Sequence, residues 1–238
     1  MAFADGDFVK VDYSVWRNAD NKLLSTTKEG FARENGIYEE QAKYAPQLVV
    51  IGKHDTIKGV EEALRSMSLG EEKKIVVEPK DAFGERDPKL VRIIPISDFK
   101  KRNIDPYQGM HLDIDGVEAI VKSVNSGRVV VDENNELAGE RLTYEIKVVE
   151  KIDSDIDRIK AVAEKLGTKV STASITNGTA HVELDEKEKN EEYEARKSVL
   201  PSYIFKYMPN INKVEILDIY ERPAEQSKEK EQKSNQLN

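Results

Sequence analysis

Two segments far apart in the chain alternate between apolar and polar residues, which predicts strands with one buried face. They are residues 8–16 and 141–149. Side chains two positions apart share one face of a strand. These faces consist of Val9, Val11, Tyr13 and Val15 in the first segment and Leu142, Tyr144, Ile146 and Val148 in the second. Pairing between the second strand and strands of the first half would let an insertion leave the sheet intact.

Residues 48–78 predict a strand, a short helix and a second strand. The apolar run at 48–51 is typical of a buried strand, and Gly52 ends it. Apolar residues recur three and four apart over about 56–67, which predicts a helix. The second strand is expected at 73–78, followed by a loop with the sequence Asp81-Ala82-Phe83-Gly84.

Two details of this helix can be predicted from residue type. His54 or Asp55 is the expected N-cap, because a polar residue there can accept from the first free N–H groups. Gly59 lies inside the helix, where glycine costs roughly 1 kcal/mol relative to alanine. We therefore expect another part of the chain to pack closely against the backbone at Gly59.

The segments on either side of this unit give weaker patterns. A short strand is expected at 22–25, and residues 26–44 predict a helix followed by a loop. Residues 86–139 contain short apolar runs separated by turn residues, which predicts a small β-meander. Its expected elements are strands at 90–96, 110–114, 117–124 and 128–132, a helical turn from Ser97, and hairpin turns at Asp115-Gly116 and Asn125-Ser126-Gly127.

The last third of the chain predicts a small unit with the order α-β-β-α-β. A helix should begin at the capping box of Ser154 and end at Gly167. Asn177-Gly178 indicates a hairpin between two strands at 168–175 and 179–184. A second helix follows near 193–207, where Pro201 should kink or break it, and a strand at 214–220 ends the unit. Residues 223–238 are charged and polar, so they are expected to be disordered.

Composition narrows the possible functions. The net charge of −8 argues against non-specific binding of nucleic acid, because such binding needs Lys and Arg to neutralise phosphates. The chain lacks an apolar run long enough for a membrane span, and its first residues are too polar for a signal peptide, so a cytoplasmic location is expected. Cysteine is absent, and the three histidines (His54, His111 and His181) lie far apart in the sequence, so we expect no metal and no other cofactor.

The motifs around the central helix resemble those of FKBP-type peptidyl-prolyl cis-trans isomerases. They read I-G-x(4)-I-x-G-x-E-E-A-L-x-x-M-x-x-G-E from Ile51 and D-A-F-G-E-R-D-P from Asp81. The resemblance covers about residues 3–152 and is nearest to the SlyD-like branch, in particular to its long archaeal members.

The resemblance implies an α+β fold with an insertion. It implies an FKBP-like antiparallel sheet with a short helix, a β-rich insert-in-flap domain, and a small α+β domain after the sheet. The expected boundaries are 1–85 and 140–152 for the isomerase domain (the host), 86–139 for the insert, 153–222 for the C-terminal domain and 223–238 for the tail. Leu137-Ala138-Gly139 matches the family's exit from the insert.

The resemblance also implies the site residues. Tyr13, Phe83, Tyr144 and the backbone N–H of Ile57 would act on the peptide bond, and Leu24, Leu48, Thr56 and Val60 would contact the substrate. The family's insert holds unfolded chains, so Ile93, Ile94, Ile96 and Phe99 are expected client contacts, although such residues are as often core. Three positions depart from the usual family pattern: Ser25 replaces an aspartate, Val60 a tryptophan of eukaryotic members, and Phe83 a tyrosine.

Three functions follow as hypotheses. The first is a prolyl isomerase and folding chaperone that acts on unfolded, proline-containing clients. The alternative is a holdase that binds unfolded chains through the insert without catalysis, which the departures at Ser25, Val60 and Phe83 would favour. A third is a structural role in assembly, since relatives with a similar extension suggest a homodimer formed through the C-terminal domain.

Overall fold

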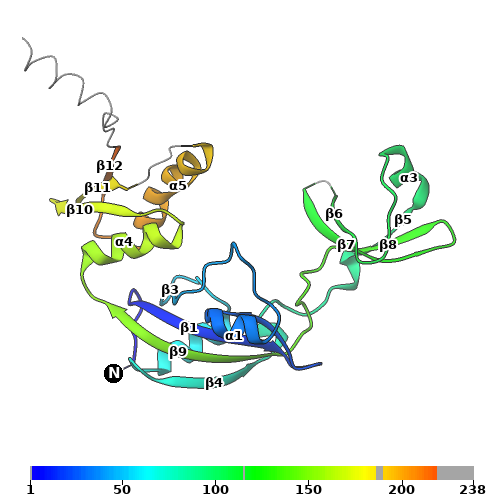
Figure 1. Ribbon diagram of the computed structural model, residues 1–238, viewed down its shortest axis with the longest axis horizontal. Helices are drawn as coiled ribbons and strands as arrows, with labels where there is room; N and C mark the ends of the chain where they lie inside the picture. The colour runs from blue at the N-terminus through cyan, green and yellow to red at the C-terminus, as the bar shows by residue number, and fades with distance from the viewer. Residues whose placement is uncertain (1, 115, 186–189, 219–238) are drawn as a thin grey trace, which may run out of the picture. The chain divides into compact units, whose positions relative to one another are not determined.

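The computed structural model describes residues 2–114, 116–185 and 190–218 (Figure 1). It forms two compact units. The first contains residues 2–3, 12–46 and the described residues of 54–148, and the second contains 4–11, 47–53 and the described residues from Val149 on. Helices and mostly antiparallel sheets are mixed in both, which confirms the predicted α+β class.

The main sheet joins strands from both ends of the host sequence. Its strand order is β2-β1-β9-β4, with β3 also paired to β1. β2 and β3 run antiparallel to β1, and β4 runs antiparallel to β9 although the insert separates them in sequence. The elements are β1 (Phe8–Arg17), β2 (Lys22–Thr26), α1 (Glu29–Glu34), β3 (Gln47–Val50), α2 (Lys58–Ser66), β4 (Glu72–Val77) and β9 (Leu142–Ile152).

Helix α2 begins later than the sequence predicts. Its N-cap is Ile57, and no side chain caps it, so the expected cap at His54 or Asp55 is wrong. The backbone of His54 is left-handed (φ +55°), which places it in the turn that precedes the extended residues before the helix. The expectation at Gly59 is confirmed, because a Cβ there would lie 2.6 Å from Cγ1 of Val77 on β4.

The insert has a sheet and a core of its own. Its strand order is β5-β8-β7-β6, and all three pairings are antiparallel. Ser126 and Gly127 both have positive φ angles, which suits the turn predicted at Asn125-Ser126-Gly127, whereas Asp115 of the two-residue turn predicted at Asp115-Gly116 lies outside the described residues. The elements are η1 (Pro79–Asp81) just before the insert, then η2 (Pro88–Leu90), β5 (Val91–Pro95), α3 (Ile96–Lys101), β6 (His111–Ile114), β7 (Val117–Asn125) and β8 (Arg128–Asp132).

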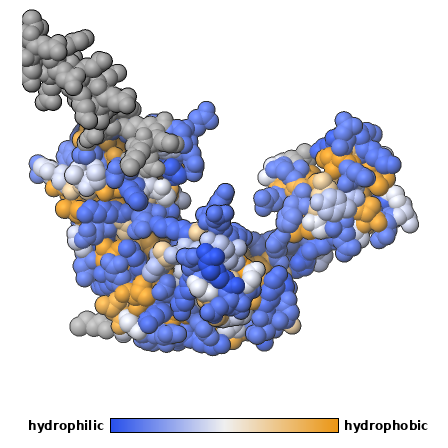
Figure 2. Space-filling model, in the orientation of Figure 1, coloured by the Kyte–Doolittle hydropathy of each residue, from blue (hydrophilic) through white to orange (hydrophobic). Residues whose placement is uncertain are grey.

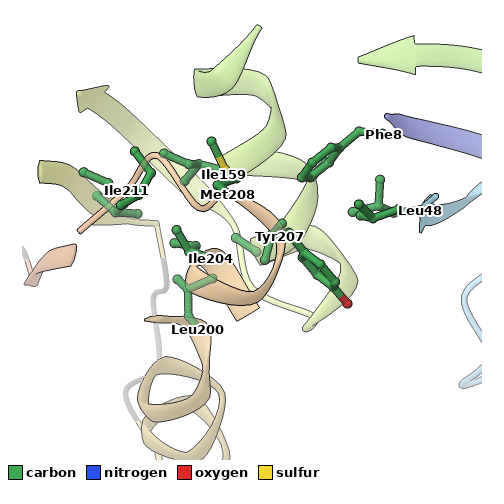
Figure 3. Packing of buried hydrophobic residues seen from close by; sticks show 14 of the residues in the cluster. Phe8, Leu48, Ile159, Leu200, Ile204, Tyr207, Met208 and Ile211 are labelled. Carbon is green, nitrogen blue, oxygen red and sulfur yellow. The ribbon is translucent and has the colours of Figure 1, made fainter. Parts of the chain in front are cut away.

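The second unit contains a large cluster of buried side chains, part of which Figure 3 shows. Ser154 caps its first helix, and Asn177 and Gly178 form the predicted hairpin turn with φ angles of +50° and +74°. The pairing β10–β11 is antiparallel and β11–β12 is parallel. The elements are α4 (Asp155–Lys165), β10 (Val170–Thr176), β11 (Thr179–Leu184), α5 (Glu191–Tyr207) and β12 (Lys213–Asp218).

Three other expectations concern Pro201, the segment at 26–44 and the tail. Helix α5 continues through Pro201, so a break there is wrong. The neighbouring Leu200 and Ile204 are fully buried, and this packing offsets the roughly 3 kcal/mol that an interior proline costs. The segment at 26–44 has the predicted helix followed by a loop: Glu29–Glu34 is helical, and residues 35–46 form turns and loop before β3. The predicted tail at 223–238 lies outside the described residues.

Candidate functional site

Two tyrosines form the centre of the candidate site. Tyr13 on β1 and Tyr144 on β9 lie on neighbouring strands of the main sheet, and their ring centroids are 6.3 Å apart with a tilt of 44°. Both side chains are half-buried. Burial, with a smaller effect of Tyr13, raises the pKa of Tyr144 to about 12. The pair therefore forms an aromatic, poorly hydrated surface.

The start of α2 supplies a backbone donor. Ile57 is the N-cap, with φ −63° and ψ 150°, and Thr56 precedes it. In the described part of the chain, no group accepts a hydrogen bond from the Ile57 N–H. The N–H groups at the beginning of a helix have no partner within the helix, so such a donor is available to a bound carbonyl. Val60, one turn further, is 5% exposed and belongs to the core.

The loop that carries Phe83 is fastened to this helix start. Lys58 Nζ lies 2.7 Å from Oδ1 of Asp81, and this hydrogen bond keeps the pKa of Asp81 below its usual value. The Gly84 N–H donates to the carbonyl of Pro79 over 2.8 Å, which closes the loop. Phe83 is 36% exposed, so its ring is available for contact with a ligand.

The remaining residues predicted for the pocket lie in different surroundings. Leu24 on β2 is half-buried, and so is Ser25, which pairs with Val15 of β1. Leu48 on β3 is 7% exposed and belongs to the core cluster of the second unit. The contacts therefore join Tyr13 to Tyr144 and the Phe83 loop to the helix start, while Leu48 packs into a core.

The four client contacts predicted on the insert fall into two groups. Phe99 is buried in the core of the insert, and Ile94 and Ile96 pack against that core. Ile93 is 63% exposed, because neighbouring residues of a strand point to opposite faces. Figure 2 shows apolar surface on the insert.

A cavity of about 350 Å³ opens beside the insert core. Ile94 and Phe99 line it, together with Ile104, Leu112 and Ile114, which the sequence analysis did not assign to a site. The alternation at 110–114 predicted a strand there but gave no sign of a cavity. Its other lining residues are Arg92, Asp98, Lys101, Arg102 and Asp113.

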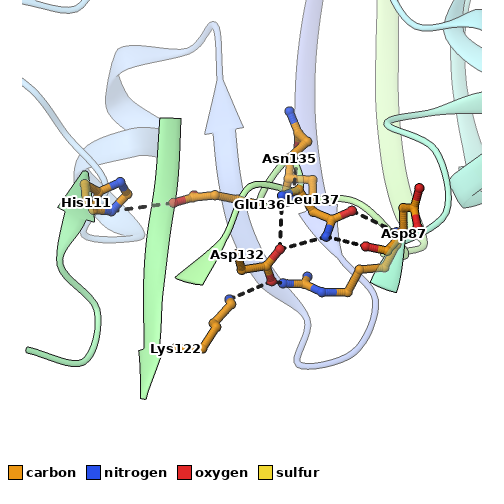
Figure 4. Close-up of polar contacts among 9 residues, drawn as sticks. Asp87, His111, Lys122, Asp132, Asn135, Glu136 and Leu137 are labelled. Carbon is orange, nitrogen blue, oxygen red and sulfur yellow. Dashed lines mark hydrogen bonds and ion pairs between the residues drawn. The ribbon is translucent and has the colours of Figure 1, made fainter. Parts of the chain in front are cut away.

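A second, open groove of about 680 Å³ connects the Phe83 loop with the insert. Its apolar lining includes Phe83, Val117, Ile120 and Leu137. Polar residues where the chain leaves the insert, Asp132 to Glu136, border this groove, and some of them bind Arg86 and Asp87, where the chain enters the insert (Figure 4). Sequence reasoning missed these contacts, since they join residues 47 positions apart.

Among the described residues, no three His, Asp or Glu side chains gather in a way that could hold a metal ion. Within the same residues, no helix combines the length and apolarity needed to cross a bilayer.

Comparisons with known proteins cover both the insert and the host. Residues 92–137 match the family model described as "FKBP26, IF domain". The chain is 38% identical over 143 residues to the "Short-type peptidyl-prolyl cis-trans isomerase" of Methanocaldococcus jannaschii, covering 60% of this chain and 90% of that protein. It is 31% identical over 111 residues to a "Probable FKBP-type 16 kDa peptidyl-prolyl cis-trans isomerase" of Pseudomonas fluorescens, covering 44% and 73%. It is 30% identical over 136 residues to the "FKBP-type peptidyl-prolyl cis-trans isomerase SlyD" of Escherichia coli, covering 55% and 68%.

Proposed function

The chain belongs to the FKBP-type peptidyl-prolyl cis-trans isomerases, and on this premise we propose that Tyr13, Ile57, Phe83 and Tyr144 form its isomerase pocket. It is an isomerase and folding chaperone of the SlyD-like kind, and the alternative of a holdase without catalysis is not favoured. The observation that carries the proposal is the tilted Tyr13–Tyr144 pair.

The reaction needs a pocket of this character. Rotation about an X–Pro bond faces a barrier of about 20 kcal/mol and takes on the order of 10–100 s without a catalyst. No nucleophile is required, since no covalent bond to the enzyme forms. The twisted amide has less charge separation than the planar one, so a dry aromatic surface favours it. Each 1.4 kcal/mol of such preference speeds the rotation about tenfold.

The roles of the pocket residues follow from their surroundings. Tyr13 and Tyr144 would hold the proline ring between neighbouring strands, and the Ile57 N–H would hold a substrate carbonyl. Phe83 would cover the bound segment, with its loop held by Lys58 and Asp81. Thr56, Val60 and Leu24 would border the pocket. Phenylalanine at 83 cannot donate the hydrogen bond that a tyrosine would. The Ile57 N–H would therefore contribute more to orienting the substrate carbonyl.

We assign client capture to the insert, residues 86–139. Ile93 presents an exposed apolar side chain, and the cavity at Ile94 and Phe99 is large enough for an apolar side chain of an unfolded chain. The proposal is that a client binds here and that its proline segments then reach the pocket. Clients would be unfolded proteins that contain proline.

The C-terminal domain, residues 153–222, has a different proposed role. Helix α5 exposes Val199 (41%) and Phe205 (43%), which are large apolar side chains on the surface of the second unit. A second copy of the chain is the partner we propose for them. Sedimentation of wild type and Phe205→Glu at tens of micromolar tests this, and a wild-type monomer would contradict it.

The isomerase proposal is tested by catalysis on two substrates. One is a proline-containing tetrapeptide, and the other is a small protein whose refolding is limited by one X–Pro bond. Tyr13→Ala and Phe83→Ala should each slow both reactions, with Phe31→Ala outside the proposed pocket as control. Refolding assistance that stays unchanged in both pocket variants would contradict the proposed pocket.

A further inference from the structure

Two chain segments connect the insert to the host, and we call them the neck: residues 84–90 on the way out and 132–139 on the way back. Backbone hydrogen bonds join the two segments at both ends. The Gly139 N–H donates to the Gly84 carbonyl over 2.8 Å, and the Glu133 N–H donates to the Leu90 carbonyl over 2.9 Å. The two segments therefore lie side by side instead of forming independent linkers.

Between these bonds, one side chain clamps the opposite backbone. The carboxamide oxygen of Asn134 accepts from the Asp87 N–H over 2.8 Å, and its nitrogen donates to the Asp87 carbonyl over 3.0 Å (Figure 4). The same nitrogen donates to Oδ1 of Asp132 over 2.7 Å. A carboxylate of the same size could accept the first bond but could not donate the other two, because it has no N–H.

Asp132 is the buried centre of this network. It ends β8 and is 2% exposed. Its carboxylate pairs with Arg86, lies 3.9 Å from Nζ of Lys122, and accepts from the backbone N–H of Asn134 over 3.0 Å. A buried charge needs several such partners, so this cluster favours one arrangement of the neck.

We propose that Asn134 is a positioning residue that holds the insert in a fixed setting relative to the Phe83 loop. The inference rests on the proposed function. Arg86 and Asp87 follow Phe83 closely in the chain, and Asp132 belongs to the sheet of the insert, so the clamp connects the loop at the pocket to the client-binding sheet. A held neck raises the effective concentration of captured client at the pocket above that of a loose one.

The test compares two variants with the same chemical change. Asn134→Asp removes both donated hydrogen bonds, keeps the size of the side chain, and places a carboxylate beside Asp132. Asn135→Asp adds the same charge one position later, and it keeps the acceptor that now binds the Leu137 N–H at 2.9 Å. Both are made in the full-length chain.

Three readouts separate positioning from folding of the insert. Because the chain has no cysteine, spin labels at Glu72→Cys and Lys100→Cys report the distance between host and insert. Affinity for fluorescent, reduced and carboxymethylated α-lactalbumin reports capture. The rate on a tetrapeptide reports the pocket alone. The rate of proline-limited refolding reports in addition the delivery of a captured client.

The expected result is specific to Asn134→Asp. Its distance distribution should broaden and its refolding kcat/KM should fall about tenfold, while its capture affinity and tetrapeptide rate stay within about twofold of wild type. Asn135→Asp should match wild type throughout. Refolding catalysis retained in Asn134→Asp, or lost together with capture affinity, would overturn the inference. Absence of tetrapeptide catalysis in the wild-type chain would refute the proposed pocket instead, and the distance measurement would still decide whether Asn134 holds the neck.

Discussion

The proposed pocket of the host and the insert use apolar side chains in opposite ways. In the host, Tyr13 and Tyr144 are half-buried on neighbouring strands, so the sheet itself holds their rings in place. In the insert, Ile93 and Tyr107 are 63% and 64% exposed, on a small domain whose core is made of few residues. A fixed, dry surface suits one reacting bond, whereas exposed apolar groups suit many different unfolded segments.

This contrast explains why one chain would need both parts. A pocket that favours a twisted amide speeds the rotation of one bond, but it does not hold the rest of a client. An exposed apolar surface binds unfolded chains without discrimination and provides no transition-state preference. In our proposal the neck sets how the two parts work together, so changes to the pocket, the insert and the neck can test the contrast directly.

The largest expected effect comes from deleting the insert, which leaves the proposed pocket without the region that captures clients. Replacing residues 86–139 by a short loop should lower kcat/KM for proline-limited refolding about 100-fold, because capture no longer raises the local concentration of client. The tetrapeptide rate should stay within about threefold. Both rates and the melting temperature of the remaining chain are to be measured, and an equal fall in both rates would contradict a separate capture site.

Changing the pocket should affect both substrates alike. Tyr144→Ala should lower kcat/KM about tenfold for tetrapeptide and protein, since a buried aromatic contact is worth about 1.4 kcal/mol in the transition state. Tyr144→Phe keeps the ring and is the matched control. Stopped-flow kinetics measure both reactions. Loss of refolding catalysis with an unchanged tetrapeptide rate would indicate that Tyr144 helps to bind the client and does not act on the peptide bond.

A smaller effect is expected on the exposed face of the insert. Ile93→Ser should weaken binding of reduced, carboxymethylated α-lactalbumin about fivefold, through loss of about 1 kcal/mol of apolar burial. Its exposed position means that the melting temperature should stay unchanged. Phe99→Ser is the contrasting variant, because it opens the insert core. Fluorescence anisotropy measures binding, and unchanged affinity in Ile93→Ser would remove this face from the client site.

The sequence allowed the local elements to be predicted better than their ends. Alternation located β1 and β9, and the Asn177-Gly178 turn was confirmed by two positive φ angles. His54 was misinterpreted as a cap, since residue type alone cannot show that its backbone is left-handed. Pro201 was expected to disturb α5, but the burial of its neighbours is a tertiary effect that no local pattern reports.

The site was predictable to a different degree in the two regions. Motifs that resemble a known family named Tyr13 and Tyr144, and the structure places their rings together. The neck could not be predicted, because the bond between Asn134 and Asp87 depends on how two distant segments are brought together. For Ile93 and Ile94 the period of a strand implied opposite faces, although the resemblance grouped them as one surface.

The smallest expected effect concerns pH, and it tests whether the pocket works without an ionising group. Burial raises the pKa of Tyr144 from 10 to about 12, so its hydroxyl stays neutral in the folded chain well above physiological pH. The tetrapeptide kcat/KM should therefore be flat from about pH 6 to 9. A group whose pKa is higher in the folded than in the unfolded chain contributes stability that is lost as the pH rises from the unfolded pKa toward the folded pKa. Any decline in rate caused by Tyr144 should therefore begin only above about pH 10 and coincide with unfolding. Rates and circular dichroism measured on the same samples check this. A bell-shaped profile in a fully folded chain would show that ionising groups take part in the reaction, contrary to a pocket that acts through a dry aromatic surface.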